Sequence, residues 1–113
     1  MAQGNIALLT KSFTAAGTLA QFQPVQASGA AATAGGNAIG FANVAASSGD
    51  LYPATVIGTS IAVAGAAITA GALVEVGSTV TQVITKSAGV AIGRALTSAS
   101  AAGDFIEVLL IPN

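Results

Sequence analysis

The acidic side chains are the first residues in this sequence that suggest chemistry, because two converging carboxylates can serve as general acid and general base. The chain contains four of them, Asp50, Glu75, Asp104 and Glu107, and it contains no His and no Cys. Asp50 and Asp104 are the natural pair, since each follows a Gly in two similar stretches of sequence. Each Gly-Asp step also stands just before an expected strand, where Asp is a common turn residue. We therefore expect a turn role for both and no paired acid–base site.

Other kinds of reactive site are equally unsupported by their neighbours. Ser and Thr are numerous, but without His they lack a base to activate them, and Lys11 or Lys86 would serve as that base only if desolvated. The stretch AGGNAIGF, residues 34–41, has closely spaced glycines but lacks the Lys-Ser/Thr pair of a phosphate-binding loop. The carboxylates are too dispersed for a calcium site. We expect no catalytic residue, no metal site and no cofactor, and hence no enzyme.

The charged residues also limit the partners of the chain. Lys11, Lys86 and Arg94 leave a net charge of −1, and three scattered cations cannot replace the counterions of a nucleic acid or hold an anionic membrane. The longest apolar stretch, residues 61–74, is too short and too interrupted for a membrane-spanning helix, which needs about 20 residues. The N-terminus lacks the basic region of a secretory signal peptide. We expect cytoplasmic synthesis and no contact with nucleic acid or membrane.

The composition indicates a protein that is stabilised by assembly. Hydrophobic residues make up 53% of the chain, charged residues only 6%, and the mean hydropathy is +0.80. The apolar material is mostly Ala and Val, with four Phe, one Tyr and no Trp, so the core of this single domain is thin. A surface with so little charge favours burial against other subunits, since soluble domains usually carry about 25% charged residues.

Two parts of the sequence resemble each other. Residues 38–50 read AIGFANVAASSGD and residues 91–104 read AIGRALTSASAAGD. Upstream, AGTL at 16–19 matches AGAL at 70–73, and the offsets agree, since 91 − 38 = 53 and 70 − 16 = 54. Chance matches are the alternative, because Ala and Gly are so common here. The shared order and spacing favour an internal duplication, with repeats at about 14–58 and 68–111.

Short strands are the expected elements, because Gly interrupts every Ala-rich run and no apolar stripe has helical spacing. One short helical turn in each of residues 42–48 and 95–102 is the alternative there. Frequent turn signals between short strands predict an all-β fold, a small barrel or sandwich built from two related halves of about 54 residues. The expected strands are residues 6–10, 19–25, 56–57, 60–63, 73–76, 80–85 and 105–111.

The domain organisation follows from the same pattern. We expect an N-terminal arm at residues 1–12 and a single β-domain at residues 13–113. The apolar residues 6–9 lie outside the predicted repeat and suit addition of a strand to a neighbour's sheet edge. The alternative is an ordinary first strand of the domain itself.

The C-terminal half has a pattern that resembles the tailed-phage capsid decoration (cement) proteins. It consists of Ile68 to Val76, then Gly89 to Leu96, then Ala101 to Leu109, and it matches the family's ending of small residues followed by Ala-Gly-Asp/Glu and a strand. The resemblance covers residues 68–111, with a fainter version over 14–58. In the first copy Pro53 stands where the second copy has Glu107, so we expect a shorter or displaced strand there.

The resemblance implies a small β-rich protein, often a homotrimer, on the outer surface of an expanded icosahedral phage head. Its partner would be the major capsid protein, whose neighbouring subunits it would clamp against the pressure of packaged DNA. Such a protein would be made in the host cytoplasm and then join the virion. Two alternatives remain: a β-rich surface or fibre/adhesion module, and a small-molecule-binding barrel, which the shortage of aromatic and polar residues disfavours.

Overall fold

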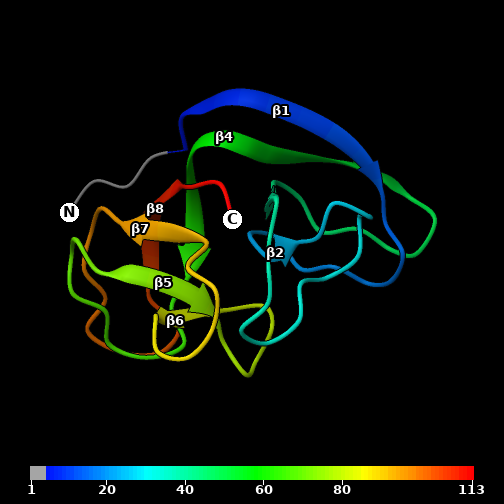
Figure 1. Cartoon of the computed structure of the whole chain (residues 1–113). Helices are drawn as coiled ribbons and strands as arrows, with labels where there is room; N and C mark the ends of the chain where they lie inside the picture. The colour runs from blue at the N-terminus through cyan, green and yellow to red at the C-terminus, as the bar shows by residue number, and fades with distance from the viewer. Residues whose placement is uncertain (1–4) are drawn as a thin grey trace.

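The computed structural model describes residues 5–113, and this part of the chain contains strands and no helix. All the strands pair in antiparallel fashion in one strongly curled sheet, which forms half of a small barrel (Figure 1). The expected all-β fold is therefore confirmed. The strands are β1 (Ala7–Thr14), β2 (Pro24–Val25), β3 (Gly40–Ala42), β4 (Leu51–Val63), β5 (Leu73–Val76), β6 (Val83–Thr85), β7 (Gly93–Ala95) and β8 (Phe105–Leu110).

The long strand β4 organises the sheet. The strand order is β2-β3-β4-β8-β7-β5-β6, and β1 pairs with β4 beside this path. The first part of β4, residues 51–58, lies between β1 and β3, whereas its second part, residues 59–63, pairs with β8. Figure 1 shows β4 bending from the arch at the top of the molecule down into the second half of the sheet.

Two predictions about β4 are wrong: that residues 56–57 and 60–63 are separate short strands, and that Pro53 shortens or displaces the strand. β4 is instead one strand of 13 residues that includes Pro53. Pro53 accepts a hydrogen bond from the Asn43 N–H but has no N–H to return. The carbonyl of Asn43 is occupied by the Gln21 amide instead, at 3.1 Å, so the missing donor of Pro53 leaves no acceptor unpaired.

Gly58 is the second reason why β4 is continuous. We expected it to separate two strands, but it lies within β4 with a φ of +114°. A Cβ at this position would lie 2.1 Å from the carbonyl oxygen of Ile6. Gly58 therefore allows the backbone at Ile6 to lie close beside β4 without interrupting the strand.

Two other expected strands are shorter than the sequence suggested. Of residues 19–25, only Pro24 and Val25 form a strand, and Leu19 makes a single bridge to Ala46. Of residues 80–85, only Val83–Thr85 form β6, because residues 80–81 turn the chain towards it. The expected strands at residues 73–76 and 105–111 match β5 and β8 closely. The helical turns considered for residues 42–48 and 95–102 do not form.

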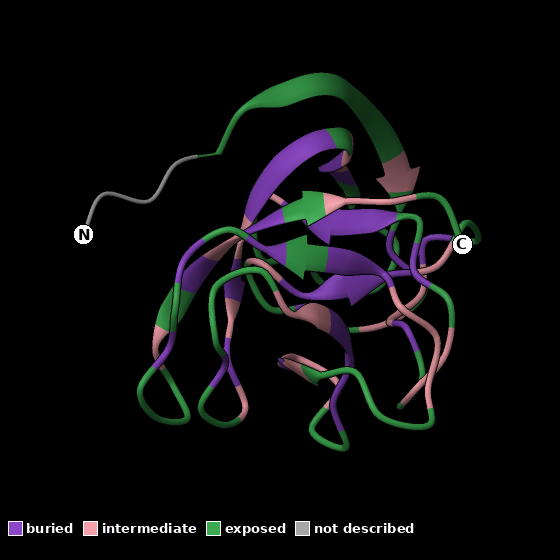
Figure 2. Ribbon diagram, turned by 60° about the vertical axis from the view of Figure 1, so that its left-hand side comes forward, coloured by how far each residue is buried: buried purple, intermediate pink, exposed green. Residues whose placement is uncertain are grey.

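The N-terminal region pairs with its own chain. β1 lies antiparallel to the first part of β4, from Ala7 opposite Gly58 to Thr14 opposite Leu51. The predicted arm boundary at residue 12 falls inside this strand, which favours the alternative of an ordinary first strand. Residues 1–4 of the predicted arm lie outside the described residues. Figure 2 shows β1 as an exposed ribbon that arches away from the body of the domain.

The two halves of the chain use the same hydrogen-bonding pattern. Leu19 and Ala46 exchange two backbone hydrogen bonds, and Ile68 and Ala99 do the same, at offsets of 49 and 53 residues. β1 pairs with the first part of β4 as the second part of β4 pairs with β8. Phe13 lies opposite Tyr52 in one ladder, and Ala62 lies opposite Ile106 in the other. These matches favour the predicted duplication, which stays a prediction.

The details of that prediction need two corrections. We matched Gly17 with Gly71, but the Phe22 N–H bonds the Ala42 carbonyl just as the Gly71 N–H bonds the Ala95 carbonyl. Phe22 therefore occupies the place of Gly71, and both have positive φ, +67° and +94°. The matching region also begins within β1, at Thr10, so residues 10–12 are not outside the pattern.

Two hydrophobic clusters fill the inner side of the sheet. The larger one consists mostly of second-half residues, among them the fully buried Val74, Val83, Ile92 and Ile106, and it also includes Phe41 from the first half. A smaller cluster in the first half is built around Leu19, Val25 and Tyr52 and otherwise consists mainly of Ala. The smaller cluster therefore buries less apolar area than the larger one, because small side chains bury little area.

Candidate interaction surface

The two aspartates considered as a pair, Asp50 and Asp104, are each engaged with their own turn. Asp104 accepts hydrogen bonds from the N–H of Ser100 at 2.9 Å, the hydroxyl of Ser100 at 2.9 Å and the N–H of Ala101 at 3.2 Å. These bonds hold the pKa of Asp104 below its ordinary value. Asp50 accepts a bond from the N–H of Ser47 at 3.0 Å. The structure thus favours the turn role for both aspartates.

The two glutamates also bind groups of their own chain. Glu75 is 7% exposed and accepts backbone hydrogen bonds from Ser87 and Gly89, so it fixes the loop after β6. Glu107 accepts a 2.7 Å bond from the Thr59 hydroxyl, whose oxygen in turn accepts the N–H of Ile6. This chain of bonds attaches the start of β1 to β4 and β8.

The cations and the glycine-rich stretch are likewise used internally. Arg94 donates to the carbonyl of Gly71 at 2.6 Å, Lys86 donates to the carbonyl of Ser87 at 3.1 Å, and Lys11 lies 5.5 Å from the centre of the Phe13 ring. In residues 34–41 the backbone N–H groups at positions 35, 36, 38 and 39 all donate within the chain. These donors are therefore not available to hold a phosphate.

Within residues 5–113, no group of three or more acidic, His or Cys side chains could hold a metal ion. The same residues contain no helix of the length and apolarity needed to span a membrane. What distinguishes this part of the chain is apolar surface that its own fold leaves uncovered.

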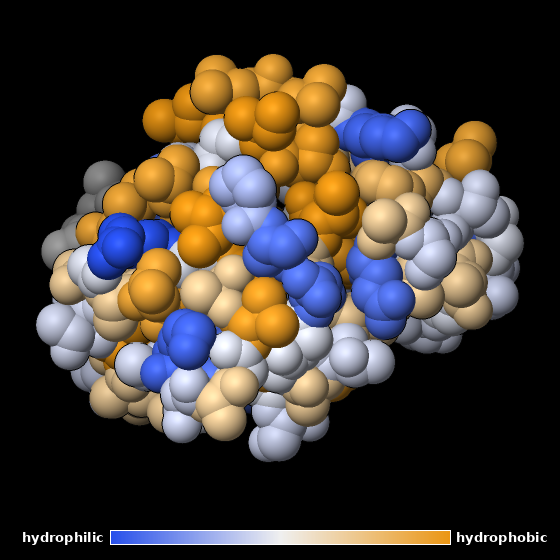
Figure 3. Space-filling view, in the orientation of Figure 1, coloured by the Kyte–Doolittle hydropathy of each residue, from blue (hydrophilic) through white to orange (hydrophobic). Residues whose placement is uncertain are grey.

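The first such surface is the apolar ridge, which we define as Ile6, Leu8 and Leu9. Their exposed fractions are 62%, 75% and 48%. Hydrophobic atoms accordingly cover the top of the face shown in Figure 3, where β1 lies in Figure 1. Apart from Phe13, the described side chains of β1 are exposed on both faces of the strand. β1 pairs only with β4 among the described residues, so one edge of the strand is also open.

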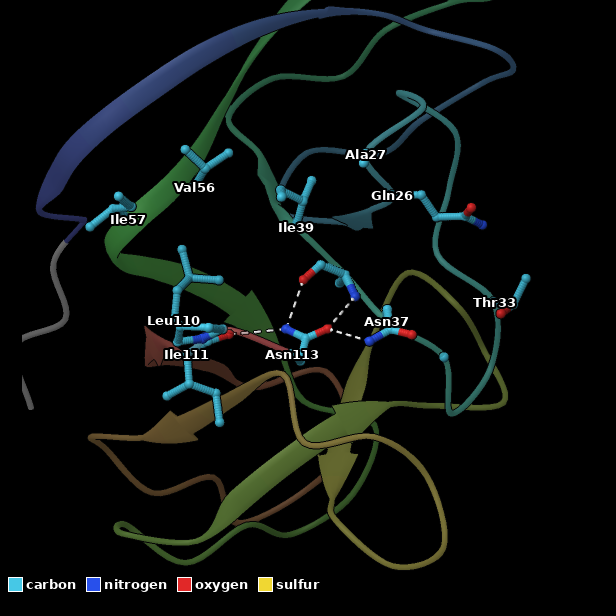
Figure 4. A pocket seen from close by; sticks show the side chains of 13 residues that line it. Gln26, Ala27, Thr33, Asn37, Ile39, Val56, Ile57, Leu110, Ile111 and Asn113 are labelled. Atoms are coloured by element: carbon cyan, nitrogen blue, oxygen red, sulfur yellow. Dashed lines mark hydrogen bonds between the residues drawn. The ribbon is translucent and has the colours of Figure 1, made fainter.

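The second surface is a groove of about 780 Å³ at the end of β8, which we call the C-terminal groove. Figure 4 shows Val56, Ile57, Leu110 and Ile111 toward one side of it, with Ile39 nearer the middle and Gln26, Ala27 and Thr33 toward the other side. No charged residue lines it. The full lining is Gln26, Ala27, Thr33, Gly36, Asn37, Ala38, Ile39, Val56, Ile57, Leu110, Ile111, Pro112 and Asn113.

Asn113 is the lining residue with the most hydrogen bonds to another part of the groove. Its side-chain oxygen accepts bonds from the Asn37 amide at 2.9 Å and the Ala38 N–H at 3.1 Å, and its amide donates to the Ala38 carbonyl at 3.0 Å (Figure 4). The last residues of the chain are thereby fixed to the loop before β3. The groove is a built feature of the fold, since two of the segments that line it, at residues 37–38 and at Asn113, are joined by hydrogen bonds.

An aromatic pair forms a third exposed feature. Phe22 and Phe105 meet edge to face, with ring centres 6.0 Å apart, and Phe105 is 51% exposed. Phe22 has a positive φ of +67°, which costs a residue with a Cβ about 1–2 kcal/mol. This strained Phe joins the first half of the chain to the start of β8.

These features define a class of protein: a small antiparallel β-domain whose charged groups bind its own loops and whose open surfaces suit contact with other proteins. The family model described as Phage cement protein matches residues 2–110. The chain therefore belongs to the phage cement protein family, and the resemblance seen in residues 68–111 is confirmed. It is a structural protein associated with the phage virion and its capsid.

The comparison with solved structures agrees with the fold. The chain is similar to the structure titled "The crystal structure of head fiber gp8.5 N base in bacteriophage phi29", with a TM-score of 0.72 at 14% sequence identity. The match covers 91% of this chain and 93% of that one. At this identity the similarity shows the fold alone. No curated protein matches the sequence.

Sequence reasoning found the apolar segment at residues 6–9 but missed the groove. The ridge was visible because four apolar residues stand together near the N-terminus. The groove combines residues around positions 26–39, 56–57 and 110–113, and no local pattern connects these three segments. The unusually low charge of the whole chain was the only signal that such a surface exists.

Proposed function

We propose that this protein decorates the outside of an expanded icosahedral phage head and stabilises it by bridging major capsid subunits. The observation that carries the proposal is the amount of apolar surface that a cement-family chain leaves uncovered. Besides the apolar ridge and the C-terminal groove, the exposed large hydrophobic residues, at 39–76%, are Val44, Leu51, Leu96, Phe105 and Leu109. Apolar patches of this kind on small proteins usually mark contact sites.

The proposal includes self-association as a homotrimer, in line with the resemblance to cement proteins, and synthesis in the host cytoplasm before assembly. It involves no nucleic acid, because the three cations are scattered and bound to their own chain. A protein that bridges subunits only in the expanded shell stabilises that state by its difference in affinity between the two states. Many copies on one shell would add to this effect.

The test uses purified protein and phage heads that lack it. Expanded heads should bind the protein and should resist heat or osmotic release of DNA better than undecorated heads. Compact, unexpanded shells should bind it poorly, since their subunit edges are spaced differently. Equal binding to both shells would contradict the maturation-specific part of the proposal, and binding to neither would contradict the whole.

The salt dependence of binding provides a second measurement. Apolar burial and backbone pairing should dominate the contact, so the affinity for expanded heads should change little between low and moderate salt. A phosphate-driven contact would instead weaken steeply. A large loss of affinity between 50 and 200 mM salt, roughly the 10³-fold or more expected for several phosphate contacts, would argue against the proposed surface.

A second candidate function is a fibre base or adhesion module. The similarity to the N base of a phage head fibre favours it. In that case the domain would attach to the head while carrying a further structure, and it would not change head stability. Binding to expanded heads without any gain in their heat resistance would favour this second function.

A further inference from the structure

We propose that the apolar ridge of one copy lies in the C-terminal groove of a second copy, so that copies associate head to tail. This inference rests on the self-association included in the proposed function, and it adds the two surfaces that meet. It is carried by a comparison of the two halves of the chain, by charge and by shape.

The groove exists because the first half lacks a cover that the second half has. Ile39 donates its N–H to the Val25 carbonyl, and Ile92 donates to the Val74 carbonyl in the same way. Ile92 is fully buried, whereas Ile39 is 45% exposed. In the second half, β6 pairs with β5 and adds Val83 to the cluster around Ile92.

The difference arises from the length of the loop between the matching strands. From Val25 to Gly40 the chain advances 15 residues, whereas from Val74 to Gly93 it advances 19. The shorter first loop folds back in a tight turn, with the Gln26 N–H bonded to the Ala30 carbonyl. Its counterpart of β6 is therefore reduced to the single bridge between Val25 and Ala31, and the side of the first half that includes Ile39 is covered less.

The rest of β1, which follows the ridge, shows the same contrast between the halves. From Thr10 to Thr14, β1 pairs with the first part of β4 in the register that the second part of β4 uses with β8. In that second part, Ser60 and Ala62 are fully buried, but the matching Lys11 is exposed and Phe13 is only half-buried. The strand that opens the first half is thus uncovered where its counterpart is covered.

Charge and shape indicate that these two surfaces fit each other. Neither contains a charged side chain, so their contact would bury no unpaired charged side chain. The ridge projects and the groove is hollow, whereas two ridges placed together would leave both grooves empty. Contact between two different surfaces of the same chain is heterologous, and such contacts form closed rings when the rotation closes.

The path of the chain supports the same direction of association. β4 carries the last strand of the first half directly into the first strand of the second half. A head-to-tail contact would place the end of β8 of one copy beside the start of β1 of the next copy. The second half of one copy would then be followed by the first half of the next, as the first half is followed by the second within one chain. Ile57, which pairs with Leu9 and also lines the groove, lies where the two surfaces meet.

Cross-linking of single-cysteine variants tests the contact, and the natural chain contains no Cys that would interfere. Leu8→Cys places a thiol on the ridge, and Ile39→Cys places one in the groove. The two variants are produced together, with tags of different size, and treated with a short bis-maleimide. A cross-linked product that contains both tags is expected, whereas neither variant alone should cross-link. The double variant should give a ladder that continues beyond the dimer, with the largest band equal to the number of copies in the ring; a ladder that ends at the dimer would overturn head-to-tail association in favour of a reciprocal two-fold contact.

Leu51→Cys is the matched control, since Leu51 is 76% exposed and belongs to neither surface. Cross-linking of Leu51→Cys with either variant, at a similar yield, would overturn the proposal as non-specific. Cross-linking of Leu8→Cys with itself would overturn it in favour of a two-fold contact between β1 strands. A folded protein, checked by circular dichroism, that gives no mixed product would also overturn it.

A second pair of variants measures the strength of the contact. Leu8→Asp should weaken self-association by roughly tenfold or more in sedimentation equilibrium, because it places a charge in an apolar contact. Leu51→Asp should leave self-association unchanged, and equal effects of the two variants would contradict the proposal. Head binding is measured separately. Mixed cross-links without head binding would reject the decoration function and retain this contact, whereas head binding by a chain without mixed cross-links would do the reverse.

Discussion

Replacement of the single tyrosine tests how the small first-half cluster is held together. Tyr52 is 1% exposed, and its hydroxyl donates a 2.8 Å hydrogen bond to the carbonyl of Gly29. Its ring lies 6.0 Å from the ring of Phe13. Tyr52→Phe keeps both rings and removes only the donor, so a buried carbonyl loses its partner. This should lower the free energy of unfolding by about 1–2 kcal/mol.

The assay is thermal unfolding at neutral pH and at one protein concentration, since association also affects the melting temperature. For a domain of this size the loss corresponds to a decrease in Tm of roughly 4–10 °C. Ser48→Ala is the control, because it removes an exposed hydroxyl from the same half of the chain. A decrease of less than about 1 °C for Tyr52→Phe, equal to that of the control, would refute the assigned role of this bond.

The pH dependence provides an independent check on the same residue. Burial raises the pKa of the Tyr52 hydroxyl above its ordinary value. The folded chain therefore holds this proton more tightly than the unfolded chain does. The contribution of the Tyr52 hydroxyl to the free energy of unfolding is fully present below about pH 10 and is lost as the pH rises through the raised folded pKa. The Tyr52→Phe variant should lose less stability over this range. Equal alkaline losses in the two proteins would contradict the burial argument.

Two further substitutions test local geometry. Phe22→Gly should have a free energy of unfolding about 1 kcal/mol higher than that of Phe22→Ala. Both variants remove the contact with Phe105, but only Gly adopts the positive φ without strain. Equal stability of the two variants would contradict the strain at Phe22. Asp104→Asn should flatten the acid side of the stability curve measured by urea unfolding. The hydrogen bonds from Ser100 lower the folded pKa of Asp104, so its contribution is complete above about pH 4 and is lost as the pH falls through that lowered pKa; an unchanged acid slope would argue against it.

The sequence predicted the parts of the fold that depend on local pattern. Alternating or β-branched apolar residues identified β5 and β8 almost to the residue. The Gly-Asp steps at positions 49–50 and 103–104 were correctly interpreted as turns, because an Asp side chain can bind the backbone N–H groups of its own turn. The family could also be recognised from the sequence, since its characteristic residues lie together in the C-terminal half.

The features that the sequence did not predict depend on contacts between distant residues. The effect of Pro53 could not be judged without knowing that Gln21 occupies the carbonyl of Asn43. A Phe gives no sequence signal of a positive φ. The structural match between Phe22 and Gly71, which both have a positive φ, could therefore not be predicted. The groove could not be foreseen because its lining combines three segments that are distant in the sequence, around residues 26–39, 56–57 and 110–113.

The single strand β4 has a consequence for how the molecule unfolds. Because residues 51–58 complete the ladder of the first half and residues 59–63 begin that of the second, separation of the halves would break one continuous strand. Neither half can therefore act as an independent cooperative unit. We expect hydrogen exchange to show the central amides of β4 opening only with the whole domain, whereas the exposed N-terminal end of β1 opens first and at much lower free energy. The chain would behave as one folding unit with a single frayed edge.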